Sequence, residues 1–365
     1  MKKIFSLCAT LVAALAMNAT EIQVNPGNGT LRAAYNAATA GDVLILAGGV
    51  YNEGEQLSLD KDITIQAAEG AQPEIAIRWY SQLINGAKVT FKGVKFDGAL
   101  YENATDGKVG ASDHCFRSYS ASTGEETLTL IDCEICNFPG YIIYAQKSAR
   151  RMYSCTMKNC YFHDNIKSVV YVETAPGASE PLPLSEVYAE NSTFVGPGAD
   201  YKAIDLKNDG TEKADAKLRI DHCTFYNYGP VRSEKSTDVT IDNSIFAFPT
   251  AGATATTLYA GAAINNCLAY NMSFGEGPTA TDCILDEDPL FADAANGDLT
   301  LDAASPAINA GNDGKTLGDS RWYPKTGTGI SNNTVSAKAV KFIENGQLII
   351  MKNGVKYDIT GAIVK

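Results

Sequence analysis

The sequence has few histidines, few tryptophans and few basic residues. Only three of its 365 residues are histidine and two are tryptophan. We find no cysteine and histidine spacing typical of zinc sites, no Ser-His-Asp motif and no glycine-rich nucleotide-binding loop. Lysine and arginine number 30 against 42 aspartates and glutamates, which gives a net charge of −12. Because binding to phosphates needs a basic surface, this balance disfavours a nucleic-acid partner.

Long apolar segments are also missing beyond the first residues. Two lysines precede the apolar stretch 4–16, which is too short to span a bilayer as a helix. Small residues that suit a signal peptidase follow at Ala16 and Ala19. We therefore expect residues 1–19 to be a signal peptide. The remaining chain is expected to be secreted or displayed at the cell surface, as a monomer with no membrane span.

One strand pattern recurs along the chain, with the form apolar-x-apolar-x-x-(Cys or Ser)-x-apolar. Its alternation predicts a strand with one buried face. The two polar residues before the Cys or Ser break the alternation, so the chain must bend there. Such a bend suits Asn and Asp, which tolerate the left-handed conformation. The copies lie at 89–96, 128–135, 155–162, 187–194, 218–225, 239–246 and 262–269, and bend residues are Asp132, Asn159, Asn191, Asn243, Asn266 and Asp282.

A strand, a bend and another strand, repeated along the chain, predict the coils of a solenoid. No strong helices separate the copies, which excludes βαβ folds. The hairpin-linked antiparallel strands of a propeller blade are missing as well. We therefore predict an all-β, single-stranded parallel β-helix.

The eight cysteines beyond the signal peptide are an even number, which in an exported protein suggests disulfides. The repeat favours another interpretation, because stacked coils lie about 4.8 Å apart and a disulfide needs Cβ atoms about 3.8 Å apart. We expect mostly free, buried thiols, with a disulfide framework as the alternative. The predicted inward column consists of Val94, Cys133, Cys160, Ser192, Cys223, Ser244 and Cys267.

Both ends of the solenoid carry recognisable segments. Thr30 is placed to cap a short helix at 31–38, which precedes strands at 43–46 and 63–65. The segment 288–324 contains Asp-Pro-Leu-Phe, Ser-Pro-Ala-Ile-Asn-Ala-Gly and Leu-Gly-Asp-Ser-Arg-Trp. These segments resemble the first coil and the exit segment of secreted bacterial pectin-lyase-like proteins. The resemblance covers 20–324 and implies a right-handed parallel β-helix capped by a helix. That fold hosts lyases, hydrolases, esterases and non-enzymes.

The composition changes after Tyr323. Residues 325–336 form a polar linker, and short strands separated by two Asn-Gly turns follow within 337–365. This tail resembles the C-terminal sorting segments of type IX-like secretion. The alternative is a plain β-hairpin appendage that closes the solenoid.

The strands after the bends place polar residues at outward positions over four successive coils. Inward neighbours such as Ile143, Val170 and Ile204 are apolar, so every second residue faces out. Tyrosine rings suit the apolar faces of sugars, and the charges complete a candidate glycan site. One outward column is Tyr144, Tyr171, Asp205 and Arg232, and the other is Gln146, Glu173, Lys207 and Glu234.

Lys207 followed one coil later by Arg232 is similar to the lysine-then-arginine arrangement of chondroitinase-B-like and alginate lyases. The resemblance implies β-elimination of a uronic acid polymer, with Lys207 as base and Arg232 as acid or carboxylate partner. Calcium bound by Glu173 and Asp205 would neutralise the substrate carboxylate, while Tyr144, Tyr171 and Glu234 contact the sugar. The sequence departs from those enzymes at Lys202, where they place an acidic residue.

Two alternatives stay open. The same face can be an ordinary solvated surface, or it can bind a glycan without turning it over. A cleft over Lys207, walled by loops at 101–126 and 174–185, would favour catalysis. His222 falls at a bend position and is expected to be structural, and His114 and His163 are placed in loops without evident partners. The paired aspartates and Gly-His-Gly motif of polygalacturonase-like hydrolases are absent.

Overall fold

The computed structural model describes residues 19–102, 109–118, 125–146, 151–173, 184–207, 214–229, 231–233, 236–250, 257–258, 261–275, 277–324, 340–344, 347–352 and 355–357. The chain divides into two compact units, 1–324 and 325–365. Residues 1–18 of the predicted signal peptide and the whole predicted linker lie outside the described residues. No helix in the described ranges combines the length and the apolar character that crossing a membrane requires.

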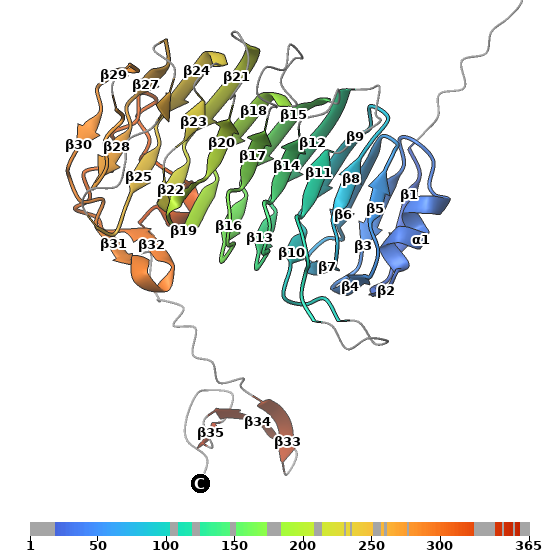
Figure 1. Cartoon of the computed structure of the whole chain (residues 1–365). Coiled ribbons are helices and arrows are strands. Elements are labelled where there is room, and N and C mark those ends of the chain that lie inside the picture. The colour runs from blue at the N-terminus through green and yellow to red at the C-terminus, as the bar shows by residue number, and fades with distance from the viewer. Residues whose placement is uncertain are drawn as a thin grey trace, which may run out of the picture. The chain divides into compact units, whose positions relative to one another are not determined.

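The first unit is a right-handed parallel β-helix, as predicted. Its coils follow one another from the blue N-terminal end to the orange last coils (Figure 1). Three parallel sheets run along it. The first sheet consists of β1 (Glu21–Val24), β3 (Val43–Leu46), β6 (Ile63–Ala67), β9 (Lys88–Lys92), β12 (Glu125–Ile131), β15 (Arg151–Lys158), β18 (Leu184–Glu190), β21 (Ala214–Asp221), β24 (Ser236–Asp242), β27 (Ala263–Asn265) and β29 (Thr279–Thr281).

The other two sheets complete each coil. The second sheet consists of β2 (Gly27–Asn28), β4 (Gly49–Glu53), β7 (Pro73–Ile77), β10 (Lys95–Asp97), β13 (Glu134–Cys136), β16 (Tyr161–His163), β19 (Thr193–Lys202), β22 (Thr224–Gly229), β25 (Ile245–Ala247), β28 (Leu268–Tyr270) and β30 (Ile284–Leu285). The third sheet consists of β5 (Leu57–Leu59), β8 (Ser81–Leu83), β11 (Phe116–Ser118), β14 (Ile143–Gln146), β17 (Val170–Glu173), β20 (Ile204–Lys207), β23 (Arg232–Ser233) and β26 (Thr257–Leu258).

The residue at the bend between the first and second sheets adopts the left-handed backbone conformation in successive coils. This confirms the prediction that Asn and Asp occupy a left-handed bend. Asp132, Asn159 and Asn191 have φ of 53°, 55° and 46°. Their side chains are joined along the solenoid, because the Asn159 amide donates to Asp132 and the Asn191 amide donates to Asn159. These bonds satisfy the side-chain amide groups at the bends. Asparagine and aspartate therefore both permit the left-handed backbone and link one coil to the next.

The cysteine and serine residues of the repeat form one buried column inside the coil. Cys160, Ser192 and Cys223 are fully buried, and the amides of Cys160 and Cys223 each donate to the serine hydroxyl of the next coil at 3.0 Å. All eight cysteines in the described part of the chain are free. The expectation of free, buried thiols is confirmed for seven of them, and Cys283 is half-buried.

A stack of phenylalanine rings fills the core beside the second sheet. Phe162, Phe194, Phe225 and Phe246 occupy successive coils in parallel register. Neighbouring ring centroids lie 5.0, 4.7 and 4.6 Å apart, and the planes tilt by 10°, 4° and 1°. Each ring packs against the ring of the next coil, so the stack connects the coils within residues 155–250 into one core.

The N-terminal end of the core is covered by α1 (Thr30–Ala37), as expected. Leu31 and Tyr35 of this helix are buried. The predicted cap is wrong by one residue: Gly29 holds the cap position with φ of 65°, while the Thr30 hydroxyl donates back to the Gly27 carbonyl. Glycine permits that left-handed entry without the steric cost of a side chain.

The exit segment, residues 286–324, folds back over the outer side of the second sheet. It contains β31 (Phe291–Asp293), the 3₁₀ turn η1 (Ala294–Asn296), β32 (Asp298–Leu301) and the 3₁₀ turn η2 (Ser320–Trp322). Leu301 and Leu317 pack against Ile245 and Leu268 in a small second core. Asp319 is buried, accepts from the Thr193 hydroxyl at 2.7 Å and pairs with Arg321 at 2.6 Å. The exit segment is therefore part of the folded solenoid.

The second unit is described over three short antiparallel strands. They are β33 (Val340–Glu344), β34 (Gln347–Lys352) and β35 (Val355–Tyr357). These strands match the sequence prediction in position. The interpretation of the C-terminal tail, residues 337–365, as a sorting segment remains a prediction.

Candidate functional site

The outward column predicted from the sequence exists on the third sheet. Tyr144 of β14 lies in register with Tyr171 of β17, Tyr171 with Asp205 of β20, and Asp205 with Arg232 of β23. The column also extends backward to Arg117 of β11. Residues between the outward positions, such as Ala145 and Val172, are fully buried. We call the surface around Arg117, Tyr144, Tyr171, Asp205 and Arg232 the third-sheet face.

Aromatic rings form a continuous layer on this face. Tyr141, from the corner before β14, stacks on Tyr171 with centroids 4.1 Å apart and planes 5° from parallel. Tyr144 lies 5.8 Å from Tyr171 and 5.4 Å from Tyr141. His114 contacts this layer at 4.6 Å from Tyr144. Tyr144 is 9% exposed, so it supports the layer from below, while Tyr141 and Tyr171 are partly exposed.

Cationic side chains lie along the edge of the aromatic layer. The Arg117 guanidinium is 5.5 Å from the Tyr144 ring and 5.2 Å from the Tyr80 ring. The Lys167 ammonium is 5.1 Å from the Tyr141 ring. Among the described side chains of this face, Arg117 lies 3.8 Å from the Asp113 carboxylate and Arg232 pairs with Asp205.

Arg232 and Asp205 form a two-bond ion pair at the end of the column. Arg232 Nε donates to Asp205 Oδ1 at 2.5 Å, and Nη2 donates to Oδ2 at 2.8 Å. Asp205 is 7% exposed, whereas Arg232 remains partly exposed. This fork geometry holds the guanidinium plane in one orientation. Calcium would have to compete with Arg232 for the Asp205 carboxylate.

The second predicted column is described only in its backbone. Gln146 lies in register with Glu173, and Glu173 with Lys207. The side chains of these three residues lie outside the described part of the structure, as does all of Glu234. Much of the two loops expected to wall a cleft, 103–108, 119–124 and 174–183, also lies outside it. The roles assigned to Lys207, Glu173 and Glu234 therefore remain predictions.

His114 anchors the corner that carries Tyr141, although the sequence placed it in a loop without partners. The Tyr141 amide donates to His114 Nδ1 at 2.8 Å, and His114 Nε2 donates to Asp113 at 3.0 Å. Burial is the main cause that lowers the pKa of His114 to about 4, and Arg117 and Lys167 add to it against Asp113. Gly140 is required here, because a Cβ would lie 2.6 Å from His114 Nδ1.

We expect His114 to make the fold weaker in acid. Its pKa is depressed from 6.5 to about 4, so as the pH falls the unfolded chain takes up a proton before the folded chain does. The stabilisation of the folded state by neutral His114 is fully present above pH 6.5, and it is lost as the pH falls from 6.5 to about 4. Since one pKa unit corresponds to about 1.4 kcal/mol, a depression of this size corresponds to a loss on the order of 3 kcal/mol. Urea unfolding of His114→Asn should show a shallower acid loss than the parent protein.

His222→Asn is the matched control, because asparagine occupies the equivalent bend in other coils. Hydrogen bonding to Asp221 is the main cause that raises the pKa of His222, against burial. That contribution is present below pH 6.5 and is lost as the pH rises through the folded pKa. The control should therefore keep or steepen the acid loss. An identical pH profile for His114→Asn and the parent would contradict the assignment.

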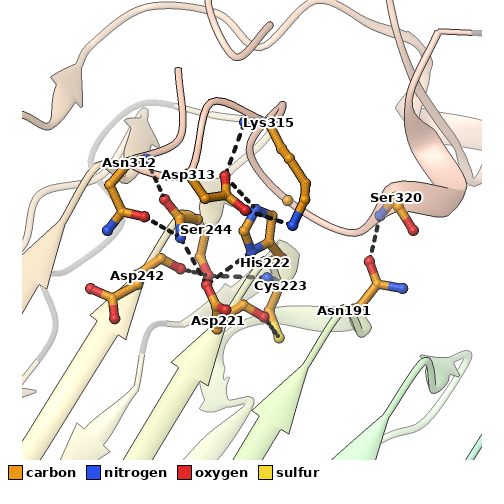
Figure 2. Close-up of polar contacts among 12 residues, drawn as sticks. Asn191, Asp221, His222, Cys223, Asp242, Ser244, Asn312, Asp313, Lys315 and Ser320 are labelled. Carbon is orange, nitrogen blue, oxygen red and sulfur yellow. Dashed lines mark hydrogen bonds and ion pairs between the residues drawn. The ribbon is translucent and has the colours of Figure 1, made fainter. Parts of the chain in front are cut away.

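His222 helps to attach the exit segment to the bends, and it lines a cavity of about 370 Å³ together with Asn191 and Lys315. Figure 2 shows it beneath the exit segment, between Asp221 and Asp313. Its Nδ1 is 2.9 Å from Asp221 and its Nε2 is 3.6 Å from Asp313. Its φ of 47° confirms the bend position. The exit segment also binds neighbouring bends, since the Asn312 amide donates to Asn243 at 2.9 Å and the Ser320 amide donates to Asn191 at 2.8 Å.

Sequence reasoning missed Tyr141, His114, Arg117 and Lys167. Arg117 follows the same outward alternation and could have been found by extending the column one coil earlier. The other three come from corners between strands, where no periodicity indicates which residues converge. Only the stacking of successive coils brings them together.

No family profile matches the sequence, and no curated protein matches it. Among solved structures, the chain is similar to a PL6-family alginate lyase, AlyGC, with 15% identity and a TM-score of 0.43. A variant of that enzyme gives 17% identity and a TM-score of 0.48. Each match covers 73% of this chain and only 37% of the other. No residue role in this chain follows from these similarities.

Proposed function

We propose that the third-sheet face binds an acidic polysaccharide and that the chain cleaves it by β-elimination as an exported lyase. The observation that carries the proposal is a partly exposed tyrosine layer bordered by Arg117, Lys167 and Arg232. Stacked rings present flat apolar surfaces to sugar faces, and the cations supply partners for carboxylate groups. These side chains stand on or beside rigid parallel strands, which favours accurate positioning of a polymer.

The chemistry assigned to this face has three parts. A cation or Arg232 neutralises the uronate carboxylate, which acidifies the C5 proton. Lys207 takes that proton, the electron pair forms the C4–C5 double bond, and the C4–O bond breaks. The leaving oxygen then takes up a proton from Arg232 or from water. A lysine acts as base only as the neutral amine, which nearby cations favour and unpaired carboxylates oppose. Pairing of Asp205 with Arg232 removes one such unpaired carboxylate.

The alternative is a glycan-binding protein that does not cleave its ligand. The same Arg232–Asp205 pair supports this alternative, because both groups already satisfy each other. Calcium binding by Glu173 and Asp205 is part of the lyase proposal and would require Asp205 to leave Arg232.

A panel of polymers tests both functions. The full chain is incubated with polyuronates and with a neutral polysaccharide of similar length, with and without calcium. We expect binding to the polyuronates alone and the appearance of ultraviolet absorbance from unsaturated uronate ends. Exchanging Arg117 for alanine should weaken binding about tenfold or more, as the loss of one charged hydrogen bond implies. The control, Lys158→Ala on the first sheet, should bind like the parent.

The outcomes separate the candidates. Binding to polyuronates without new absorbance, in either the presence or absence of calcium, would replace the lyase by the glycan-binding alternative. Equal binding by the Arg117 and Lys158 variants would show that another surface holds the polymer. No binding to any polyuronate would remove the third-sheet face from consideration.

A further inference from the structure

Cys136 differs from the cysteines that fill the core. It lies on the outer side of the second sheet, next to the inward residue Ile135, and it is absent from the main hydrophobic cluster. In register with it are Asp97 of β10 on one side and His163 of β16 on the other. The polymer-binding proposal makes no use of this group.

Glu134, Cys136 and His163 bring three ligand atoms together. A Glu134 carboxylate oxygen, Cys136 Sγ and a His163 ring nitrogen all lie within 4.8 Å of one another. Glu134 Oε1 is 3.3 Å from His163 Nε2. Zinc bonds to oxygen, nitrogen and sulfur measure about 2.0–2.3 Å, so ligand atoms around one ion lie roughly 3–4 Å apart. Small side-chain rotations would therefore complete the coordination.

A carboxylate behind the His163 ring orients it, as is usual for histidines that bind metal ions. Its Nδ1 lies 2.6 Å from Asp164 Oδ2, so Nδ1–H donates to the carboxylate. Nε2 faces Glu134 and donates to it in the metal-free protein, and loss of that proton would turn the Nε2 lone pair to an ion. The ring also stacks on Tyr161 with centroids 4.2 Å apart. A carboxylate behind the imidazole sets the tautomer and orients the ring toward an ion. The contact between His163 and Asp164 is therefore a second observation in favour of a metal site, separate from the distances among the three ligand atoms.

We propose that Glu134, Cys136 and His163 form a zinc site whose fourth position is taken by solvent. A sulfur, nitrogen and oxygen donor set suits zinc better than calcium or magnesium, which prefer oxygen ligands. The Glu134 side chain is 42% exposed and Cys136 is 1% exposed, so an ion would reach the thiolate from the Glu134 side. Glu134 and Cys136 belong to one coil and His163 to the next, so the ion links two successive coils.

Lys95 is the group that opposes the ion. Its ammonium lies 3.5 Å from Glu134, 3.2 Å from Asp97 and 3.8 Å from Glu74. When Glu134 turns to zinc, Asp97 and Glu74 still pair with the lysine. Its charge repels the ion, so Lys95→Met should bind zinc more tightly than the parent.

The test uses the reduced full chain with cobalt as a spectroscopic probe and zinc as competitor. We expect one ion per chain, with a thiolate-to-cobalt charge-transfer band that zinc abolishes. Cys136→Ser should lose the band, and Asp164→Asn should keep it while weakening affinity about 10–100-fold, as loss of an orienting carboxylate does. Cys283→Ser, which removes the half-buried thiol outside the cluster, is the matched control and should behave like the parent.

Thermal unfolding gives a second measurement. Zinc should raise the unfolding midpoint of the parent and of Cys283→Ser, and should leave Cys136→Ser unchanged, because an ion that binds only the folded chain stabilises it. A band that persists in Cys136→Ser, or that is missing at millimolar cobalt in the parent, would overturn the proposal. Neither result depends on whether the third-sheet face binds a polymer.

Discussion

Exchanging Lys207 for alanine should abolish elimination activity while leaving the fold intact. Removal of a general base slows the chemical step by about 10²–10⁴-fold. Lys207 follows the buried Leu206 on β20, and its backbone lies in register with Glu173. A polar residue at such a strand position contributes little to stability, typically within about 0.5 kcal/mol. The measurement is the initial rate of ultraviolet absorbance increase on the polyuronate that the parent cleaves.

Lys158→Ala is the control for this change. Lys158 also lies near the end of a parallel strand, but on the first sheet, where it pairs with Glu190 at 2.6 Å. Its loss should leave the rate unchanged. Unfolding in urea establishes that both variants are folded. A Lys207 variant that retains the parent rate would assign the base to another residue, and a loss of rate in both variants would point to general damage.

Exchanging Phe194 for alanine should destabilise the solenoid by about 3–5 kcal/mol, as is usual when a buried aromatic ring is removed. Phe194 is fully buried and lies between Phe162 and Phe225, at 5.0 and 4.7 Å between ring centroids. Both neighbours would face the cavity, and strands held in parallel register cannot easily close it. Urea unfolding followed by far-ultraviolet circular dichroism measures the change.

Two further variants make this prediction specific. Phe194→Leu keeps most of the volume and should cost less than the alanine variant. Val50→Ala removes a side chain that is 42% exposed and should change stability by less than about 0.5 kcal/mol. If Phe194→Ala unfolded at the same urea concentration as Val50→Ala, the continuous ring stack would not be a source of stability.

Local residue patterns were sufficient to predict the solenoid. The bend at Asn159 and its equivalents needs a left-handed residue in every coil, and alternation beside it needs one buried face. Both requirements act within a few residues, so they are readable without knowing which coils are neighbours. The column of Tyr144, Tyr171, Asp205 and Arg232 could be predicted for the same reason, because the pattern sets the register of each coil.

The contents of the corners could not be predicted in this way. His114 and Tyr141 meet only because a corner of one coil stacks on a corner of the next. The corners differ in length, so the spacing in the sequence does not reveal which residues meet. The ion pair of Arg232 with Asp205 depends equally on rotamers set by neighbouring coils. The catalytic part of the site was predicted by resemblance, and Lys207 still rests on that resemblance and on backbone register.

The sequence by itself determined the coil, the bend, the inward column and the free thiols, because each follows from preferences within one repeat. Tertiary structure alone decided which outward residues became partners. Cys136 and His163 meet across two coils, and Asp319 of the exit segment reaches Thr193 more than a hundred positions earlier. Such contacts are set by how the coils stack and where the chain returns. No residue pattern within one repeat contains that information.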